Sequence, residues 1–156
     1  YAIGDVYTGQ WKDDMREGCG RYVSANGDVY VGEFHNDVRH GRGAYTMVTG
    51  DKYEGEFKNG TPNGKGTFWF ENGDIFEGAF VDDLFHGEGL LTCANGSSYH
   101  GEFERGVKQG NGCYTLVNGD IYEGEFKNGV FEGEGIYTFA SGGEIRGAFH
   151  NGRPVE

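Results

Sequence analysis

Glutamate pairs two residues apart recur along the chain, as in Glu54/Glu56 and Glu123/Glu125. Two carboxylates that face each other across a pocket, one with a raised pKa, can act as the acid and the base of a glycoside hydrolase. Residues two apart on a strand share one face, however, so these pairs indicate an acidic, solvated sheet surface. The sequence also contains no evident Ser-His-Asp or Cys-His arrangement. We therefore predict that the protein is not an enzyme and uses no cofactor.

Histidine and cysteine supply a second candidate chemistry, metal binding. His86, Cys93 and His100 are spaced seven residues apart, and both residue types bind zinc. The spacing matches no recognised ligand pattern, and Cys93 and His100 are expected on opposite faces, so we predict no metal site within one chain. A metal shared between subunits stays open. With Cys19 and Cys113, the cysteines form an odd set without a CxxC pair, which favours reduced thiols and a cytoplasmic location.

Glycine and aromatic residues recur with a period of 23 residues, as from Tyr7 to Tyr30. Each leading aromatic is followed by a glycine and a second aromatic at alternate positions, as in the sequence YVGEF of residues 30–34. A G-x-G such as Gly41/Gly43 comes next and recurs six times. A phosphate-binding glycine loop requires a helix after it, and none is expected here. The glycines therefore indicate closely packed strands.

The period divides the chain into a single array that covers residues 1–156. Residues 1–6 align with the end of a repeat, so we expect them to be the remnant of a preceding one. Residues 145–156 form a partial C-terminal repeat. The complete repeats are predicted at 7–29, 30–52, 53–75, 76–98, 99–121 and 122–144.

Each repeat is predicted to form a β-hairpin. Side chains alternate in residues 30–34 and again in 43–47, with a loop expected at 35–40 and a tight Asn-Gly turn at sites such as Asn72-Gly73. One surface, the aromatic face, carries Tyr30, Gly32, Phe34 and their equivalents. Rings are expected over the equivalents of Gly32 on neighbouring strands, such as Gly101. The opposite surface, the outer face, is acidic. The predicted fold is all-β: an elongated single-layer antiparallel β-sheet solenoid, twisted and curved.

The formal net charge of −12 bears on the partners. We see no cluster of Lys and Arg, so binding to nucleic acid is not expected, and binding to anionic lipid is doubtful. The sequence also has no apolar run near the ~20 residues that a membrane-spanning helix needs.

The repeats resemble those of the MORN-repeat family. Residues 53–60 and 122–129 both read YEGEFKNG, which is close to the ideal form of that repeat, and the resemblance extends over essentially the whole chain. It implies a hairpin-repeat fold. A chain made only of repeats is most similar to the cytoskeletal scaffold members of protists, which implies homo-oligomerisation, unidentified cytoskeletal or membrane-associated protein partners and a cytoplasmic, cytoskeleton-associated location. Phosphoinositide binding, which is also attributed to the family, is the alternative.

Two sets of residues are predicted to make contacts with other chains. Aromatic residues outside the main repeat positions are the candidate partner contacts: Trp69, and Phe85 and Phe131, which are both expected in loops. The last strand has Ile145 where the other repeats have an aromatic residue and Ala148 where most have Glu, which makes it more apolar than most of its equivalents. We therefore predict an antiparallel homodimer through the C-terminal repeats, with an interface formed by Phe126, Phe131, Tyr137, Phe139, Ile145 and Phe149.

Overall fold

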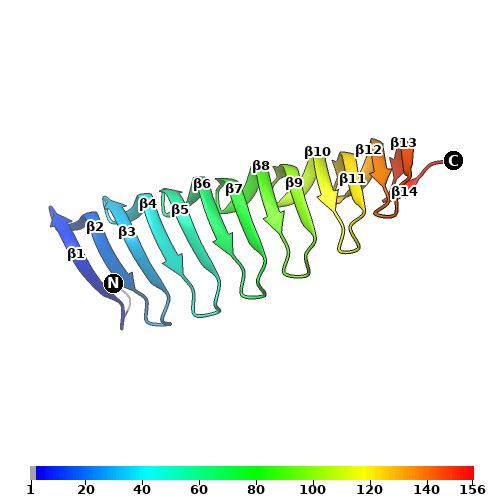
Figure 1. The fold of residues 1–156 in the computed structure, drawn as a ribbon. Helices are drawn as coiled ribbons and strands as arrows, with labels where there is room; N and C mark the ends of the chain where they lie inside the picture. Colours follow the sequence, from blue (N-terminus) through cyan, green and yellow to red (C-terminus); the bar gives the residue numbers. More distant parts are fainter. Residues whose placement is uncertain (1–2) are drawn as a thin grey trace. The chain divides into compact units, whose positions relative to one another are not determined.

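The structure is a computed structural model, and it describes residues 3–156. The regular elements of these residues are all β-strands, and their order in the sheet follows the chain from β1 to β14, as Figure 1 shows. Neighbouring strands pair antiparallel, so the predicted all-β fold of antiparallel hairpins is confirmed. The strands are β1 Val6–Lys12, β2 Met15–Val23, β3 Val29–His35, β4 Val38–Thr46, β5 Lys52–Lys58, β6 Thr61–Trp69, β7 Ile75–Val81, β8 Leu84–Thr92, β9 Ser98–Glu104, β10 Val107–Thr115, β11 Ile121–Lys127, β12 Val130–Thr138, β13 Glu144–His150 and β14 Arg153–Pro154.

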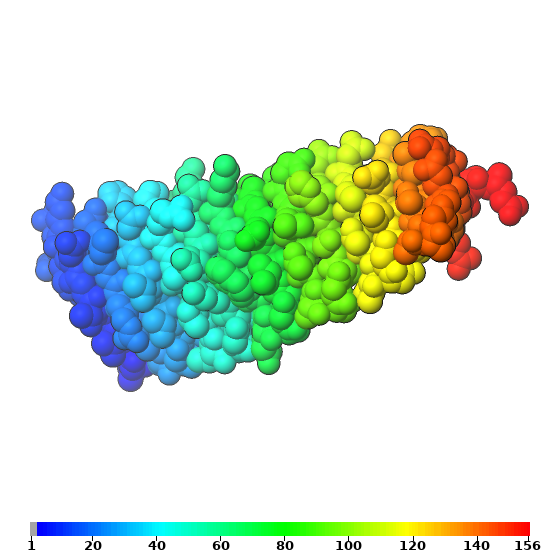
Figure 2. Space-filling view, in the orientation of Figure 1, coloured from blue at the N-terminus to red at the C-terminus, as the bar shows by residue number. Residues whose placement is uncertain are grey.

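The chain divides into two compact units. The first unit comprises Tyr1–Gly73 and Phe80–Asp83, and the second comprises Asp74–Ala79 and Leu84–Glu156. Within each unit every hairpin packs against its neighbours in sequence, so successive repeats lie as successive colour bands in Figure 2. This nearest-neighbour packing is the defining property of repeat proteins.

Two-residue turns close the hairpin of each repeat. In the turn between β3 and β4, Asn36 and Asp37 both have positive φ, at 47° and 69°. Positive φ at both central residues is the signature of a type I′ turn, for which Asn, Asp and Gly are suited. The loop predicted at 35–40 is therefore wrong. Strand β4 begins at Val38, and it accommodates its extra residues as a bulge opposite Gly32/Phe34.

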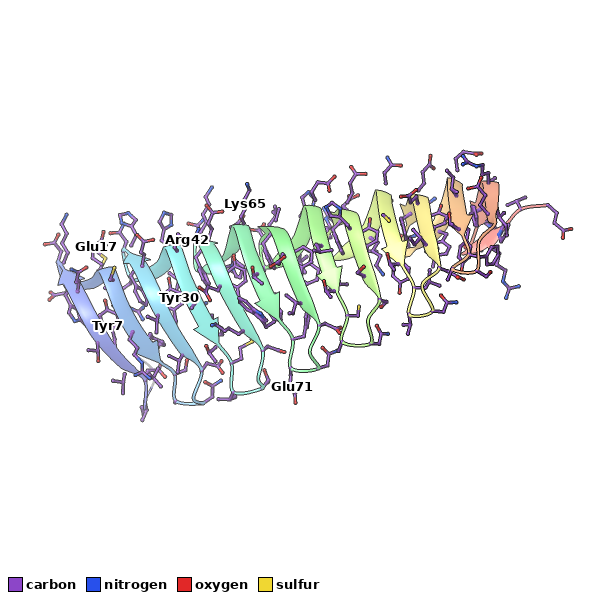
Figure 3. The ribbon with its side chains drawn as sticks, viewed as in Figure 1. Tyr7, Glu17, Tyr30, Arg42, Lys65 and Glu71 are labelled. Atoms are coloured by element: carbon purple, nitrogen blue, oxygen red, sulfur yellow. The ribbon has the colours of Figure 1, made fainter. Side chains whose placement is uncertain are left out.

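Wider turns join one repeat to the next. Between β2 and β3, the Gly27 amide donates to the Ser24 carbonyl and the Ser24 amide donates to the Asp28 carbonyl. Here only the glycine has positive φ, at 98°. Asn-Gly therefore occurs in both kinds of turn: in wide turns, as at Asn26-Gly27, and in tight turns at the other end of the strands, as at Asn59-Gly60. Figure 3 shows this separation in the first unit: Glu17, Arg42 and Lys65 lie toward the tight-turn end and Glu71 lies at the wide-turn end.

The core of each unit is a ladder of rings on the aromatic face. The Tyr30 ring meets Phe34 of its own strand and Phe57 of the next repeat in T-shaped contacts, with centroids 5.0 and 5.1 Å apart. Such edge-to-face pairs are the preferred geometry of aromatic contacts. From the second repeat onward the ladder rings are at most 4% exposed: Tyr30, Phe34, Tyr53, Phe57 and Phe80 in the first unit, and Phe76, Tyr99, Phe103, Tyr122, Phe126 and Phe149 in the second.

Glycines provide the space for these rings, but not at the position that was expected. A Cβ on Gly112 would lie 2.5 Å from the Tyr99 ring, so the second glycine of the G-x-G carries the ring. A Cβ on Gly101 would instead lie 2.5 Å from the Gly112 Cα and 2.6 Å from the Asn111 carbonyl oxygen. Rings do lie over glycine, as predicted, while the glycine between two ladder aromatics allows the backbones of paired strands to approach.

Candidate functional site

The outer face is acidic, but some of its carboxylates have structural roles. Glu33 Oε2 accepts a 2.5 Å hydrogen bond from the Arg42 amide, and Glu102 Oε2 accepts one of 2.6 Å from the Asn111 amide. These amides lie beside the bulge, where Arg42 and Asn111 have left the regular pairing with the preceding strand. Glu33 and Glu102 therefore satisfy backbone donors, which is a structural role. The expectation that they are merely solvated is corrected at these positions.

The functional candidate lies on the aromatic face, at a position nine residues after each leading aromatic. We call it the covering position, because its side chain lies over the ladder rings. Its occupants differ in chemistry from one repeat to the next, whereas the ladder itself is nearly constant. They are Arg16, Arg39 and Pro62 in the first unit, and Phe85, Lys108, Phe131 and Pro154 in the second.

Phenylalanine at the covering position stacks on the ladder. Phe85 lies parallel to Phe76 with ring centroids 3.8 Å apart, and Phe131 lies parallel to Tyr122 with centroids 3.9 Å apart. Both residues lie near the beginning of strands, β8 and β12, so their predicted placement in loops is wrong. Their position follows from the two-residue turn, which starts the second strand earlier than the sequence suggested. A partner could contact only the ring face turned away from the ladder.

Arginine at the covering position stacks between a ladder ring and a less buried tyrosine. The Arg16 Cζ is 4.9 Å from the Tyr22 centroid and 5.2 Å from that of Phe34. In the next repeat the Arg39 Cζ is 4.8 Å from the Tyr45 centroid and 5.7 Å from that of Phe57. A guanidinium over a ring is attracted by the negative ring face. The same cation–aromatic arrangement is therefore built twice in the first unit.

A groove runs along these two repeats. One cavity, of about 320 Å³, is lined by Arg16, Tyr22, Ser24, Phe34, Asp37, Val38, Arg39, Tyr45 and Gly60. A second, of about 260 Å³, is lined by Arg39, Tyr45, Met47, Tyr53, Phe57, Gly60, Thr61, Pro62, Phe68 and Asp83. They share the lining residues Arg39, Tyr45 and Gly60, so the two cavities are adjacent, and we call them together the first-unit groove. All of its lining residues belong to the first unit.

The tyrosines that flank the groove are held by aspartates of the preceding wide turn. The Tyr45 hydroxyl donates a 2.9 Å hydrogen bond to Asp28 Oδ2, while Asp28 Oδ1 accepts the Val48 amide. Tyr22 donates in the same way to Asp5. Burial, followed by the bond to Asp28, raises the pKa of Tyr45. These phenols therefore remain neutral at physiological pH and present fixed rings to the groove.

The charges of the groove offset one another. Arg16 Nε lies 3.1 Å from Asp37 Oδ1, and the Arg16 amide and then its side chain lower the pKa of that carboxyl group. Arg39 and Asp83 also line the groove and interact electrostatically. Within residues 3–156 no carboxylate comes within 4.0 Å of the Arg39 guanidinium, so Arg39 forms no direct ion pair.

The remaining predicted partner contact, Trp69, lies apart from this groove. It ends β6 on the outer face, where it pairs with Lys52. The Lys52 Nζ lies 5.2 Å from the Trp69 ring centroid and 3.3 Å from Glu54 Oε2. Sequence reasoning missed the groove residues Arg16 and Arg39, although the varied chemistry at the covering position was a visible signal.

The six residues of the predicted dimer interface are unequally accessible. Phe126 and Phe149 are 3% exposed and pack against Tyr122. Phe131 stacks on the same ring, and the Tyr137 hydroxyl donates to Asp120. Only Phe139 and Ile145, at 38% and 36%, present a large exposed surface to another molecule.

The metal candidates are separated by the fold. His86 in β8 and His100 in β9 are exposed, while Cys93 lies half-buried in the wide turn between these strands. Over residues 3–156 no three His, Cys, Asp or Glu side chains are grouped so as to hold a metal ion. The same residues include no helix that is long and apolar enough to cross a membrane.

Comparisons with known proteins agree with the repeat architecture. A family model described as MORN repeat matches residues 7–29, 30–52, 53–75, 76–98, 99–121 and 122–144. A search of curated proteins finds no match. Among solved structures, the TCP domain of SAS-4 (dCPAP) of Drosophila melanogaster, in complex with a proline-rich motif of Ana2 (dSTIL), is similar with a TM-score of 0.56. The sequences are 14% identical over 94% of this chain and 79% of that one, so the likeness concerns the fold alone.

Proposed function

Because the chain belongs to the MORN-repeat family, we propose that it is a non-catalytic scaffold that binds protein partners on its aromatic face and also associates with itself. The first-unit groove is the observation that carries this proposal. Rings, stacked arginines and a nearly neutral charge balance suit a peptide segment, since aromatic residues and Arg are enriched where proteins bind one another.

The similar TCP domain supports a protein partner, because its structure was solved in complex with a motif of another protein. The resemblance to all-repeat scaffolds favours a cytoplasmic, cytoskeleton-associated location. Self-association is assigned to repeats 122–156, where Phe139 and Ile145 are exposed. Phosphoinositide binding is the weaker alternative, since the net charge of −12 opposes attraction to an anionic membrane.

A selection from a random peptide library displayed on phage tests the partner-binding role without assuming a sequence. The intact chain is immobilised, and selected peptides are remeasured against Tyr45→Ala and against the matched control Tyr114→Ala, which alters the equivalent position of a second-unit repeat. We expect peptides whose binding is lost with Tyr45→Ala alone. Selection of no peptide, or of peptides indifferent to Tyr45, would contradict the proposal.

Vesicle flotation tests the alternative function, phosphoinositide binding. Vesicles of phosphatidylcholine with and without phosphatidylinositol bisphosphate are mixed with the chain at ~150 mM salt, where exposed charges are screened beyond about 8 Å. We expect no flotation in either case. Retention on the bisphosphate vesicles alone would favour the headgroup-binding role over the scaffold role.

A further inference from the structure

The occupant of the first-unit groove follows from its spacing and its polar groups, given the partner-binding role proposed above. We propose that the groove takes a proline-rich segment of the partner in the polyproline II conformation, laid across the strands of the first unit, with every third residue directed into the groove. The argument rests on three properties of the groove: its period, its aromatic walls and its hydrogen-bonding groups.

The period of the groove matches that of a polyproline II helix. Equivalent residues such as Tyr22 and Tyr45 are two strands apart, on β2 and β4. At about 4.8 Å per strand, the repeat spacing along the sheet is about 9.6 Å. A polyproline II helix rises about 3.1 Å per residue with three residues per turn, so every third side chain recurs at about 9.3 Å. An extended β-strand peptide would have side chains on one face about 6.8 Å apart and would lose register within one repeat.

The walls of the groove are of the kind that polyproline II helices bind. Tyr22, Tyr45 and Phe68 occupy the same position in three consecutive repeats, all half-buried. The hydrogen bonds to Asp5 and Asp28 fix the two tyrosine rings before a ligand arrives. Grooves lined by aromatic rings recognise proline-rich segments because the ligand is already ordered and flat-sided. Less conformational entropy is then lost by either partner.

The polar groups of the groove also suit a proline-rich chain. Proline offers a backbone carbonyl and no N–H, so such a ligand is rich in acceptors and poor in donors. Arginine carries five donors and no acceptor, and Arg39 has no ion pair within the described residues. Arg39 is therefore placed to donate to a ligand carbonyl. The nearby carboxylates Asp37 and Asp83 offset the arginine charges, which favours uncharged residues at the contacting positions.

Binding of designed peptides tests the inference on the intact chain. The probe is a fluorescein-labelled peptide of four Pro-Pro-Leu triplets, in which every leucine lies on one face of the polyproline II helix. A second peptide of the same composition spaces the leucines alternately two and four residues apart. A third replaces every proline by glycine. Fluorescence anisotropy is expected to show binding of the first peptide, with affinity at least about tenfold weaker for the other two.

Variants of the chain locate the site. Tyr45→Ala and Arg39→Met are each expected to weaken the probe about tenfold or more, a loss of about 1.4 kcal/mol. Tyr45→Phe, which keeps the ring but loses the hydrogen bond to Asp28, is expected to weaken the probe less than Tyr45→Ala does. Tyr114→Ala in the second unit is expected to change the affinity less than about twofold. Circular dichroism of each variant confirms that it folds. If Tyr45→Ala fails to fold, the decision rests on Arg39→Met.

The inference is overturned if the probe does not bind at about 1 mM, if both leucine spacings bind equally, or if Tyr114→Ala weakens binding as much as Tyr45→Ala. These outcomes remain distinct from failure of the proposed function. Selection of peptides that need Tyr45 but lack proline would leave a protein-binding groove and reject only the polyproline ligand. Selection of no peptide at all would reject both.

Discussion

The Tyr45 hydroxyl in β4 donates a 2.9 Å hydrogen bond to Asp28 in the wide turn that precedes β3, so a side chain of one repeat is tied to the turn before it. The other oxygen of the same carboxylate accepts the Val48 amide of the following wide turn. Asp120 makes the same pair of contacts, with Tyr137 at 2.6 Å and the Ala140 amide at 2.8 Å. One aspartate thus joins two consecutive wide turns.

These contacts make stability depend on pH in the acid range. The Val48 amide and then the Tyr45 hydroxyl lower the pKa of Asp28, and Tyr137 followed by the Ala140 amide lowers that of Asp120. A carboxyl group with a lower pKa in the folded state stabilises the fold above its unfolded pKa of about 3.9 and loses this effect as pH falls. We expect the melting temperature to drop steadily from about pH 4 downward.

Substitution of Asp28 and Asp120 isolates their contribution to the fall of the melting temperature in acid. The double variant Asp28→Asn/Asp120→Asn should show a shallower fall of melting temperature below about pH 4 than the unaltered chain. Asp13→Asn is the matched control, because Asp13 lies in a tight turn at a φ of 51°, which asparagine also tolerates. An equally steep fall in the double variant would show that other carboxylates dominate the acid response.

Tyrosine ionisation makes stability depend on pH in the alkaline range as well. Burial raises the pKa of Tyr53 and of Tyr99 to about 12, and the hydrogen bond to Asp120 raises that of Tyr137 to about 12. Groups held neutral in the fold stabilise it below their unfolded pKa of about 10, and this effect is lost as pH rises toward 12. Ultraviolet titration of phenolate should show several tyrosines ionising only as the fold is lost. Complete ionisation near pH 10 with circular dichroism unchanged would contradict this.

The glycine beneath each ladder ring is expected to resist substitution. Gly112→Ala places a Cβ 2.5 Å from the Tyr99 ring, and overpacking of this kind costs about 1–3 kcal/mol. Urea unfolding should show the loss. The same substitution made with Tyr99→Leu tests the cause, because a smaller side chain should relieve much of the cost. An unchanged cost in that background would place the strain in the backbone rather than at the ring.

The carboxylates beside the bulge should matter through their oxygen atoms rather than their charge. Glu102→Ala leaves the Asn111 amide to water and is expected to cost about 1 kcal/mol, whereas Glu102→Gln should be nearly neutral. Gln10 already plays this role in the first repeat, where its Oε1 accepts the Cys19 amide at 2.8 Å. Glu123→Ala, on the exposed outer face, is the control and should be neutral. Equal losses of stability in Glu102→Ala and Glu102→Gln would contradict the role of Glu102 as a hydrogen-bond acceptor.

Much of the fold was predictable because glycine and aromatic positions report it directly. Gly32 and Gly43 pair across β3 and β4, and their shared period gave the hairpins. The bulge around Gly41 was not predictable, because it looks like loop sequence until the two-residue turn is known. That error placed Phe85 and Phe131 in loops and concealed the groove. Arg16 and Arg39 become a site only when the turn sets them over rings of adjacent strands.

Self-association is expected to depend on the exposed apolar residues of the C-terminal repeats. Phe139→Ser/Ile145→Ser should convert a dimer at tens of micromolar into a monomer, as measured by light scattering after size-exclusion chromatography. Phe139 and Ile145 are 38% and 36% exposed, so the change should cost little stability. Val117→Ser, at a side chain 64% exposed in another wide turn, is the control and should stay dimeric. A monomeric unaltered chain would reject the dimer outright.

Chemistry at the covering position should be partly interchangeable between repeats. Phe131 stacks on Tyr122 with centroids 3.9 Å apart, and its removal in Phe131→Ala should cost about 2 kcal/mol. Arg16 and Arg39 occupy the same position over tyrosine and phenylalanine rings. A planar guanidinium can replace the stacked ring, so Phe131→Arg should cost less than half as much in urea unfolding.

Val130→Ala, next to Phe131 and 41% exposed, provides the control and should change stability by less than about 0.5 kcal/mol. Equal destabilisation by the Ala and Arg variants of Phe131 would mean that each repeat is adapted to its own covering residue. The presence of arginine at the covering position in the first unit and of phenylalanine in the second would then be a requirement of folding. If arginine is tolerated, the covering position is free to vary with the partner, and the arginines of the first unit mark a binding surface rather than a packing need.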